Sequence, residues 1–332
     1  MQFAIQVAGG QVRHNQYGIE AVVDEARLAE ALGFTAVFVP DHYVFEAMGV
    51  LQCHSPAYEM FFVMATLAQR TRTIRIGSHV ACLLFRHPAM HARLFAQIDE
   101  ASGGRVIAGV GAGWTRAEFD MMGIRFPEVS ERLRILDEAT TVIRGLWAHQ
   151  PFTFRGEYYQ VSEAVCLPKP VQQPGPPLML GGSGNGILRR AGEWADIIHM
   201  VPTIGAAGTT TLDEIRNFSD ASLTDKLARV RAAEAKAGRP PGSVRFASTV
   251  FNYAMTASPE DTQALAERMS VLFRMPPDEF RKHPIALIGT PEEMITELQR
   301  RAAAHELSLL AINFSDIDQL RDFGEKVLPY VE

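Results

Sequence analysis

The sequence predicts an α/β protein built as a (β/α)8 TIM barrel, and three observations support this fold class. Short apolar runs rich in β-branched residues recur along the 332 residues, and stretches with helical spacing follow them. The hydrophobic residues make up 47% of the chain, which is enough for one large core. The alternation of strand and helix also resumes after each interruption, so we expect a single domain over residues 1–332.

The first half of the chain contains four predicted strand and helix units. The predicted strands cover residues 3–7, 36–39, 74–79 and 106–109. The first helix places apolar residues of 19–32 on one face and ends at Gly33, a third helix covers about 88–101, and the fourth has an apolar face from Leu133 to Trp147. The run at residues 60–68 is apolar on nearly all sides, so it is either a buried barrel helix, which we favour, or part of a homodimer interface.

An insertion interrupts the rhythm after the fourth unit. The run FTFRGEYYQV predicts a hairpin, and the proline-rich CLPKPVQQPGPP follows it. Further strands are predicted at 178–180, 197–200, 244–252 and 309–314, with helices ending at Trp194 and covering 223–237 and 317–331. Ser258 and Thr290 read as the caps of two more helices. The polar, glycine-rich segment after the sixth strand, residues 201–222, is expected to be a long mobile loop over the active site.

Composition excludes several classes of partner. Lys and Arg number 32 against 38 Asp and Glu, which gives a net charge of −6 and no basic stripe, so nucleic acid is not expected. No apolar window reaches the ~20 residues of a membrane span, and the first residues do not form a signal peptide. The cysteines Cys53, Cys82 and Cys166 fit neither a disulfide framework nor a metal site, so we expect a cytoplasmic protein.

In an eight-stranded barrel the active site lies at the carboxyl ends of the strands. This rule selects residues from five strand ends: Gln6, Ala8, Asp41, His42, Ser78, His79, residues 111–114 and residues 181–186. Of these, His42 beside Asp41 is the best general acid or base, because a histidine exchanges protons near neutral pH. The alternative is that Asp41 and His42 only cap a loop.

Two glycine-rich runs follow strands. GVGAGW, residues 109–114, lacks the spacing of a dinucleotide fingerprint and no helix is expected directly after it, so from this motif alone a tight turn is favoured over backbone that approaches a planar ligand, with Trp114 at the rim. GGSGNG, residues 181–186, precedes a helix, and its backbone amides would face a phosphate. A flexible turn is the alternative. Arg189 and Arg190 lie one turn into this helix, where they could reinforce the site or be solvated.

Four segments resemble the luciferase-like monooxygenase superfamily, most closely its bacterial deazaflavin-dependent branch. These segments are ARLAEALGFTAVFVPDHY, RHPAMHARLFAQIDEASGGRVIAGVGAGWTRAEFDMMGIRF, RGEYYQVSEAVCLPKPVQQPGPPLMLGGSG and IGTPEEMITEL. The resemblance runs almost end to end. It implies a barrel that binds flavin mononucleotide (FMN) or the 5-deazaflavin coenzyme F-420 and that moves hydride or activates oxygen.

The resemblance also implies roles for individual residues. The cofactor ring would lie near Ser78, His79 and Val80, with a cis peptide bond at His79-Val80, and His42 would lie beside the ring. The phosphate would meet Gly181, Gly182 and Ser183, and the backbone of Gly111, Ala112 and Gly113 would line the path of the cofactor tail. Apart from the resemblance, we expect residues 43–58 and the loop after Met200 to shape the substrate pocket, with Tyr43 and Trp114 among its residues. Sugar-phosphate dehydrogenases of the family carry Glu where this chain has Trp114, so a glucose-6-phosphate reaction is not expected.

We therefore expect an oxidoreductase that transfers hydride between reduced F-420 and a small organic substrate, with His42 and Asp41 as catalytic residues. An FMN-dependent monooxygenase with a separate reductase is the alternative. A metal-dependent hydrolase that uses Asp41, His42, His54 and His79 is disfavoured because no His-x-His pair follows the first strand, and no metal is expected. A non-catalytic flavin-binding protein is a third interpretation.

Overall fold

The computed structural model describes the chain except residues 8–17, 44, 48–49, 53–57, 206–209 and 332. Its central sheet is a closed barrel of parallel strands: β1 (Gln2–Gln6), β2 (Ala36–Val39), β5 (Arg75–Ser78), β7 (Val106–Gly111), β10 (Leu178–Gly181), β11 (Ile197–Met200), β12 (Arg245–Val250) and β15 (Leu307–Ile312). These strands pair in chain order, and β15 pairs with β1 to close the barrel. The short β6 (Ala81–Cys82) pairs with β7. The predicted (β/α)8 fold is confirmed.

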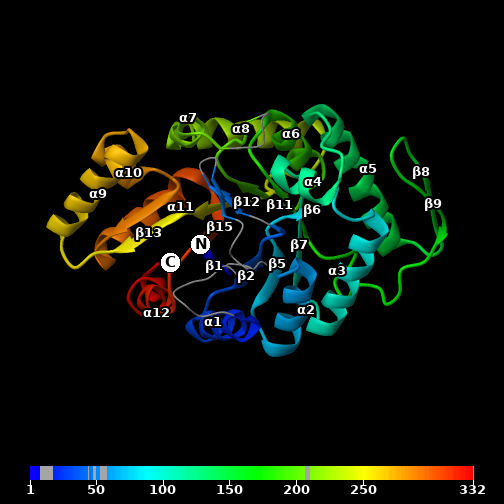
Figure 1. Ribbon diagram of the computed structural model, residues 1–332, viewed down its shortest axis with the longest axis horizontal. Coiled ribbons are helices and arrows are strands. Elements are labelled where there is room, and N and C mark those ends of the chain that lie inside the picture. Colours follow the sequence, from blue (N-terminus) through cyan, green and yellow to red (C-terminus); the bar gives the residue numbers. More distant parts are fainter. Residues whose placement is uncertain (8–17, 44, 48–49, 53–57, 206–209, 332) are drawn as a thin grey trace.

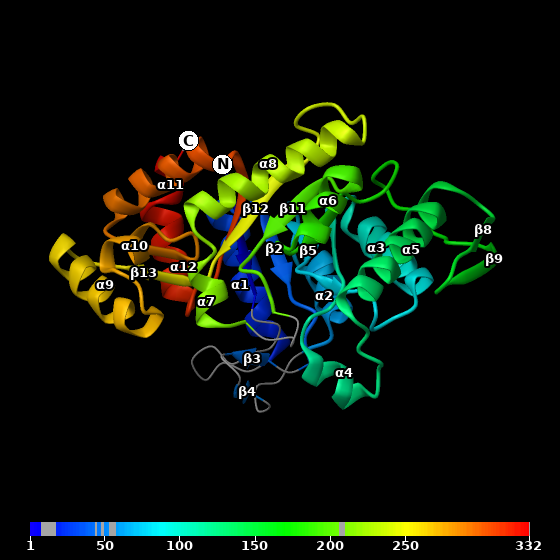
Figure 2. The ribbon, with the colours of Figure 1, turned by 90° about the horizontal axis from the view of Figure 1, so that it is seen from above.

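Helices surround the barrel (Figures 1 and 2). They are α1 (Ile19–Leu32), α2 (Met60–Arg70), α3 (Pro88–Ser102), α5 (Val129–Ala148), α6 (Asn185–Trp194), α8 (Asp220–Lys236), α11 (Pro291–His305) and α12 (Ile317–Lys326). The apolar run of α2 is a barrel helix, because Met60, Phe61 and Met64 are buried in the main core while Phe62 is 50% exposed. No helix in the described part of the chain is long and apolar enough to cross a membrane.

Two insertions interrupt the barrel. The predicted hairpin is present as β8 (Phe152–Arg155) and β9 (Gln160–Ala164), which project beyond α5 (Figure 1). A second insertion, which the sequence did not predict, follows β12 and contains β13 (Asn252–Met255), α9 (Pro259–Phe273), α10 (Pro277–Lys282) and β14 (Ala286–Gly289). Strands β13 and β14 form a separate parallel pair. The predicted strand at 244–252 was therefore too long, because the chain leaves the barrel after Val250.

Other element boundaries also differ from the prediction. The expected mobile loop at 201–222 contains α7 (Leu212–Arg216), which begins with a capping box from Thr211, and the start of α8, which Ser219 caps. These caps satisfy backbone N–H groups locally, so a polar sequence can still begin helices there. The expected helix at 317–331 ends at Lys326, and a short 3-10 turn, η1 (Leu328–Tyr330), follows it. A capping box at Thr290 begins α11, as predicted.

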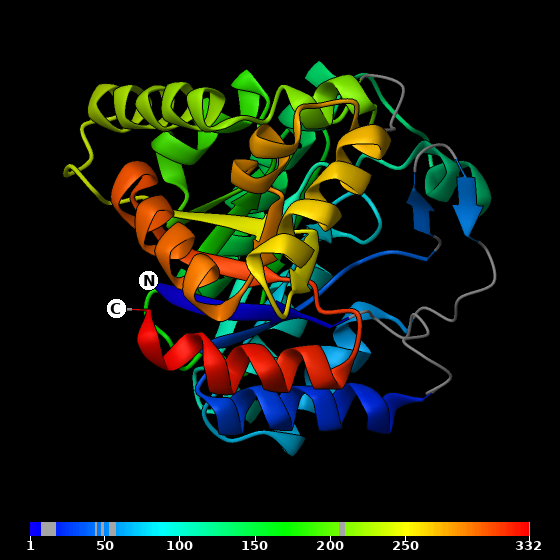
Figure 3. The same ribbon diagram turned by 90° about the vertical axis from the view of Figure 1, so that its left-hand side faces the viewer.

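The interior of the barrel has its own buried apolar cluster. Its residues come from seven strands: Ala4, Ala36, Phe38, Ile107, Met179, Ile197, Ala247, Leu309 and Ala311. Side chains two residues further along these strands belong to the next layer, at the carboxyl ends. At that end of the molecule lie β3 (Phe45–Ala47), β4 (Val50–Gln52) and α4 (Arg116–Met122), on the side opposite the two termini (Figure 3). The apolar cluster thus closes the barrel beneath its mouth.

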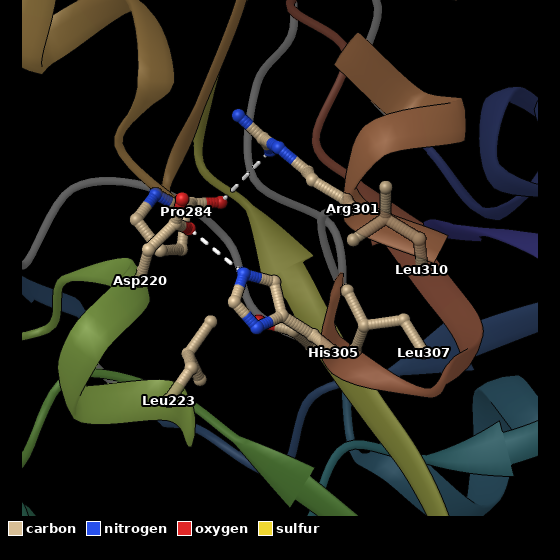
Figure 4. A pocket seen from close by; sticks show the side chains of 8 residues that line it. Asp220, Leu223, Pro284, Arg301, His305, Leu307 and Leu310 are labelled. Carbon is tan, nitrogen blue, oxygen red and sulfur yellow. Dashed lines mark hydrogen bonds and ion pairs between the residues drawn. The ribbon is translucent and has the colours of Figure 1, made fainter. Parts of the chain in front are cut away.

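A polar network ties α11 to its neighbours on the outside of the barrel (Figure 4). Arg301, 2% exposed, donates hydrogen bonds to the carbonyl oxygens of His283, Pro284 and Ala286 at 3.1, 3.3 and 2.6 Å. His305 Nε2 lies 2.9 Å from Asp220 Oδ1. Asp220, Pro284, Arg301 and His305 line a small crevice together with strand residues that include Leu307 and Leu310 of β15. Because Leu307 begins β15, this crevice lies away from the carboxyl ends of the strands.

Candidate active site

A chain of hydrogen-bonded side chains from four strand ends forms the floor of the barrel mouth. His79 Nδ1 lies 3.1 Å from Gln6 Oε1, and His79 Nε2 lies 2.8 Å from His199 Nδ1. His199 Nε2 in turn lies 2.7 Å from Thr249 Oγ1. Burial lowers the pKa of His79 to about 4 and lowers the pKa of His199 well below its usual value, so both rings are neutral at pH 7. The His79 ring also stacks on Phe38, with centroids 5.2 Å apart.

The peptide bond between His79 and Val80 is cis, as predicted. The Val80 side chain packs against glycines of two neighbouring strands, Gly111 of β7 and Gly181 of β10. A Cβ atom at Gly111 would lie 2.7 Å from Val80 Cγ2, and one at Gly181 would lie 2.9 Å from it. Glycine at these positions therefore makes room for Val80. At Gly111 the space on the side of an added Cβ is filled by Val80.

Two more predicted cofactor residues are engaged within the protein. Ser78 is fully buried, and its Oγ donates a 2.6 Å hydrogen bond to the carbonyl oxygen of Gly109. Gly113 has a φ of +73°, and a Cβ there would lie 2.7 Å from Cys82 Sγ. Ala112, the residue before Gly113, is partly buried. Ser78 thus joins β5 to β7, and its hydroxyl does not reach the mouth.

Asp41 lies in a buried ion pair. Its carboxylate, 4% exposed, accepts two hydrogen bonds from Arg86 at 2.8 and 2.9 Å and one from the backbone N–H of Cys82 at 3.0 Å. Arg86 also donates to Glu59 at 2.6 Å and to the Tyr43 hydroxyl at 3.3 Å. The carboxylate of Asp41 therefore anchors the loop after β2, and its partner Arg86 contacts the Tyr43 hydroxyl.

His42 contacts a residue that the sequence analysis missed. His42 Nδ1 lies 3.0 Å from Glu118 Oε2, and the backbone N–H of Tyr43 donates to Glu118 Oε1 at 2.6 Å. The rings of His42 and Trp114 pack edge to face, with centroids 5.5 Å apart. Glu118 lies on α4, which begins two residues after Trp114, so the expectation that no helix directly follows GVGAGW was wrong. The available signal was the spacing Thr115-x-x-Glu118, because Thr three residues before Glu is a sequence signature of a helix start, and Thr115 is the N-cap of α4.

The GGSGNG loop leads into α6, as predicted. Gly184 is the N-cap of α6 and, as a glycine, makes no side-chain cap hydrogen bond. The loop above it is held by other contacts: the Gly182 N–H donates to the carbonyl oxygen of His199 at 2.9 Å, and Ser183 Oγ donates to that of Val201 at 2.5 Å. The uncapped first turn of α6, rather than the Gly182 amide or the Ser183 hydroxyl, therefore offers backbone N–H groups to an anion.

The two arginines of α6 do not face an anion site. Arg190 is buried and donates two 2.6 Å hydrogen bonds to Asp137 of α5. Arg189 forms an exposed pair with Glu193 at 2.7 Å.

Another arginine, on α5, is buried with donors that are unpaired in the described structure. Arg132 of α5 is 5% exposed, and its Nε and Nη1 have no hydrogen-bond partner among the described residues. Its guanidinium lies over Phe126, 4.0 Å from the ring centroid. The next residue, Leu133, packs against the first turn of α6, since a Cβ at Gly186 would lie 2.6 Å from Leu133 Cδ1. A buried cation with unpaired donors fits an anionic ligand.

The structure holds no group of three or more His, Cys, Asp or Glu residues suited to a metal ion within its described parts. Cys82 and Cys166 are buried free thiols. Ala8, Cys53 and His54 lie outside the described residues, so the sequence predictions for them have no structural counterpart here.

Comparisons with known proteins agree with the fold. The family model described as "Luciferase-like monooxygenase" matches residues 1–308. An F-420-dependent glucose-6-phosphate dehydrogenase from Amycolatopsis mediterranei is 28% identical over 97% of both chains. An FMNH(2)-dependent dimethylsulfone monooxygenase from Pseudomonas putida is 29% identical over 74% of this chain and 70% of its own. The structure of an F-420-dependent secondary alcohol dehydrogenase with an F-420-acetone adduct superposes with a TM-score of 0.78 at 23% identity, covering 100% of this chain and 99% of that one. The chain belongs to the luciferase-like monooxygenase family.

Proposed function

We propose that the protein is an oxidoreductase that binds coenzyme F-420, or alternatively FMN, at the barrel mouth and acts on a small organic substrate. Relatives named for each cofactor align with most of the chain. The observation that carries the proposal is the buried, unpaired guanidinium of Arg132, because both cofactors bring an anionic phosphate to the protein. When bound, either cofactor supplies the hydride or oxygen chemistry, and the protein binds, orients and protonates.

The phosphate site would combine Arg132 with the first turn of α6. Arg132 supplies a full positive charge and two donor nitrogens, Nε and Nη1, that have no partner in the described structure. The start of α6 supplies backbone N–H groups and the positive end of the helix dipole. Gly181, Gly182 and Ser183 shape the loop through their contacts with β11 and Val201, instead of meeting the phosphate directly.

The ring site would lie on Val80 and the polar floor. Val80 is partly buried and packs against the inner core of the barrel. Asn313, which follows β15, has a buried Oδ1 without a partner among the described residues, and this oxygen can accept a hydrogen bond from a ligand N–H. The apolar Val80 and the polar Asn313 suit a planar ring that has one apolar face and a polar edge.

His42 would supply or take the proton of the reaction. Its side chain is 21% exposed, whereas that of its partner Glu118 is 2% exposed, so His42 is the member of the pair that a ligand can reach. Asp41 would act indirectly, because its pair with Arg86 fixes the residue before His42. Tyr43 and Trp114, which flank His42, would line the substrate side.

An FMN-dependent monooxygenase is the alternative, and it would need a separate reductase as partner. Trp114 stands where sugar-phosphate dehydrogenases of the family carry Glu, so glucose-6-phosphate is not the proposed substrate. We further propose a cytoplasmic location, on the free thiols Cys82 and Cys166. A homodimer is also proposed, without an assigned interface.

Titration of the purified protein with F-420 and FMN, in oxidised and anaerobically reduced form, tests the assignment by the change in cofactor fluorescence. We expect saturable binding of at least one cofactor, and binding of neither would overturn the proposal. A screen of small alcohols, aldehydes and ketones with the bound cofactor then provides a turnover assay. In that assay His42→Ala should lose roughly 10²- to 10⁴-fold in turnover with nearly unchanged cofactor affinity. Wild-type turnover in this variant would remove His42 from the mechanism.

A further inference from the structure

We propose that Glu118 is a positioning residue that fixes the tautomer of His42, with the proton on Nδ1, and thereby makes Nε2 the atom that exchanges a proton. This inference rests on the proposed function, in which His42 is the acid or base. Glu118 has no role in the sequence-based prediction of the site.

The hydrogen bonds of the carboxylate determine the tautomer. Glu118 Oε1 accepts from the backbone N–H of Tyr43 at 2.6 Å, and Oε2 lies 3.0 Å from His42 Nδ1. An ionised carboxylate only accepts hydrogen bonds, and a backbone N–H only donates them. His42 Nδ1 must therefore be the donor in its contact with Glu118, which leaves Nε2 as the nitrogen that gains or loses a proton.

The surroundings hold this pair in place. Glu118 is 1% exposed on α4, and Phe119, the next residue, packs between Phe85 and Phe126 with ring centroids 5.0 and 4.9 Å away. The Trp114 ring limits rotation of His42 from one side. Because Glu118 binds both the backbone of Tyr43 and the ring of His42, it fixes the loop and the imidazole together.

Glu118→Gln changes the hydrogen-bonding capacity with little change of shape. A glutamine has one acceptor oxygen and one donor NH2 group. The Tyr43 N–H needs the oxygen, so the NH2 group must face His42 Nδ1 and donate to it. This arrangement forces the proton of His42 onto Nε2, which is the wrong tautomer for exchange there. Loss of the correct tautomer in a histidine that acts as a general base costs up to about 10⁴-fold in turnover.

The experiment measures the tautomer directly and turnover separately. The ring nitrogens of His42 are observed by ¹⁵N NMR in the full-length protein and assigned with His42→Gln. We expect a protonated Nδ1 in the wild type and a protonated Nε2 in Glu118→Gln. We also expect cofactor affinity within a few-fold of wild type and turnover lower by roughly 10²- to 10⁴-fold. Glu138→Gln is the matched control, because Glu138 also accepts backbone N–H groups, from Glu157, Tyr158 and Tyr159, but has no contact with His42 among the described residues.

The outcomes separate this inference from the proposed function. An unchanged tautomer in Glu118→Gln overturns the inference even if the protein is an oxidoreductase. A reversed tautomer with wild-type turnover also overturns it when His42→Ala is inactive. If His42→Ala retains wild-type turnover as well, the proposed role of His42 fails, and the inference fails with it. Wild-type tautomer and turnover in Glu138→Gln, together with the expected changes in Glu118→Gln, support it.

Discussion

Arg132→Met should weaken cofactor binding, and it should also raise the free energy of unfolding of the cofactor-free protein. The guanidinium is 5% exposed, and its Nε and Nη1 lack partners in the described structure. Leaving buried donors unpaired costs about 1–3 kcal/mol. Methionine removes these donors and can still pack its flexible chain on Phe126. The lost cation-π contact offsets about 0.5–2 kcal/mol of the gain, so the free energy of unfolding should rise by about 1 kcal/mol.

The effect on affinity follows from the hydrogen bonds that Arg132 would make to the phosphate. Hydrogen bonds to charged groups contribute about 1.5–3 kcal/mol, so the dissociation constant should rise roughly 10- to 150-fold. Both F-420 and FMN should be affected, because the phosphate is common to them. Turnover at saturating cofactor should change little.

Urea unfolding of the cofactor-free protein and calorimetric titration with each cofactor measure the two effects. Arg134→Met is the matched control, since Arg134 lies on the same helix but is 53% exposed and contacts Tyr158 and Glu157. This control should change neither stability nor affinity by more than a few tenths of a kcal/mol. A destabilised Arg132→Met that binds cofactor as tightly as wild type would refute the assignment of Arg132 to the phosphate.

Two further predictions concern stability. Burial lowers the pKa of His79 to about 4, against about 6.5 when unfolded, so between these values the unfolded chain binds a proton that the native protein does not. The contribution of neutral His79 to the free energy of unfolding should therefore be fully present above pH 6.5 and should fall by up to about 3 kcal/mol as the pH decreases to 4. Urea titrations at pH 7.5, 6 and 5 should show a shallower decrease in the free energy of unfolding for His79→Gln than for the wild type. An equal decrease in the two proteins would contradict the assignment. Arg301→Met should cost about 3–5 kcal/mol in urea unfolding, because it leaves three buried carbonyl oxygens without this donor and Glu297 without one of its two arginines. Arg300→Met, at a 36% exposed side chain, should cost less than about 1 kcal/mol, and equal losses for the two variants would argue against this network.

The barrel could be predicted from sequence because its strands are short apolar runs with helices of regular spacing between them. The second insertion could not be predicted from sequence. Its strand β14 has four residues and pairs with β13 outside the barrel, and in the sequence such a short apolar run cannot be distinguished from a buried barrel strand. The prediction that the polar segment 201–222 is a loop missed α7 for another reason. This helix is five residues long and begins with the Thr211 capping box, and it has no buried residue that would give a periodic apolar pattern.

The sequence selected several residues of the candidate site by their position and none of the contacts between them. Strand ends selected His42, His79 and the GGSGNG loop, because position along a strand can be read from the sequence. Glu118 and Arg132 lie on helices, where a polar residue ordinarily faces solvent, and only the packing of α4 and α5 buries them. His199 is the third residue of the run IIHM in β11, and its inward direction depends on a strand register that the sequence alone did not fix.

Substitution of Gly184 tests most directly the central claim that a phosphate-bearing cofactor binds at the start of α6. Gly184 is better suited than Gly182, whose φ of +128° would strain any side chain. At Gly184, φ is −71°, and no atom lies within 4 Å of an added Cβ. Aspartate and asparagine are both good N-caps, so neither variant should lose stability.

The two variants differ in charge at the proposed phosphate site. A carboxylate about 4 Å from a phosphate costs up to about 4 kcal/mol near a protein surface. Calorimetric titration with F-420 and FMN should therefore give dissociation constants on the order of 10²- to 10³-fold higher for Gly184→Asp and within about tenfold of wild type for Gly184→Asn. If Gly184→Asp is folded by circular dichroism and binds both cofactors as tightly as Gly184→Asn, the phosphate does not lie at α6 and the account of this site is wrong.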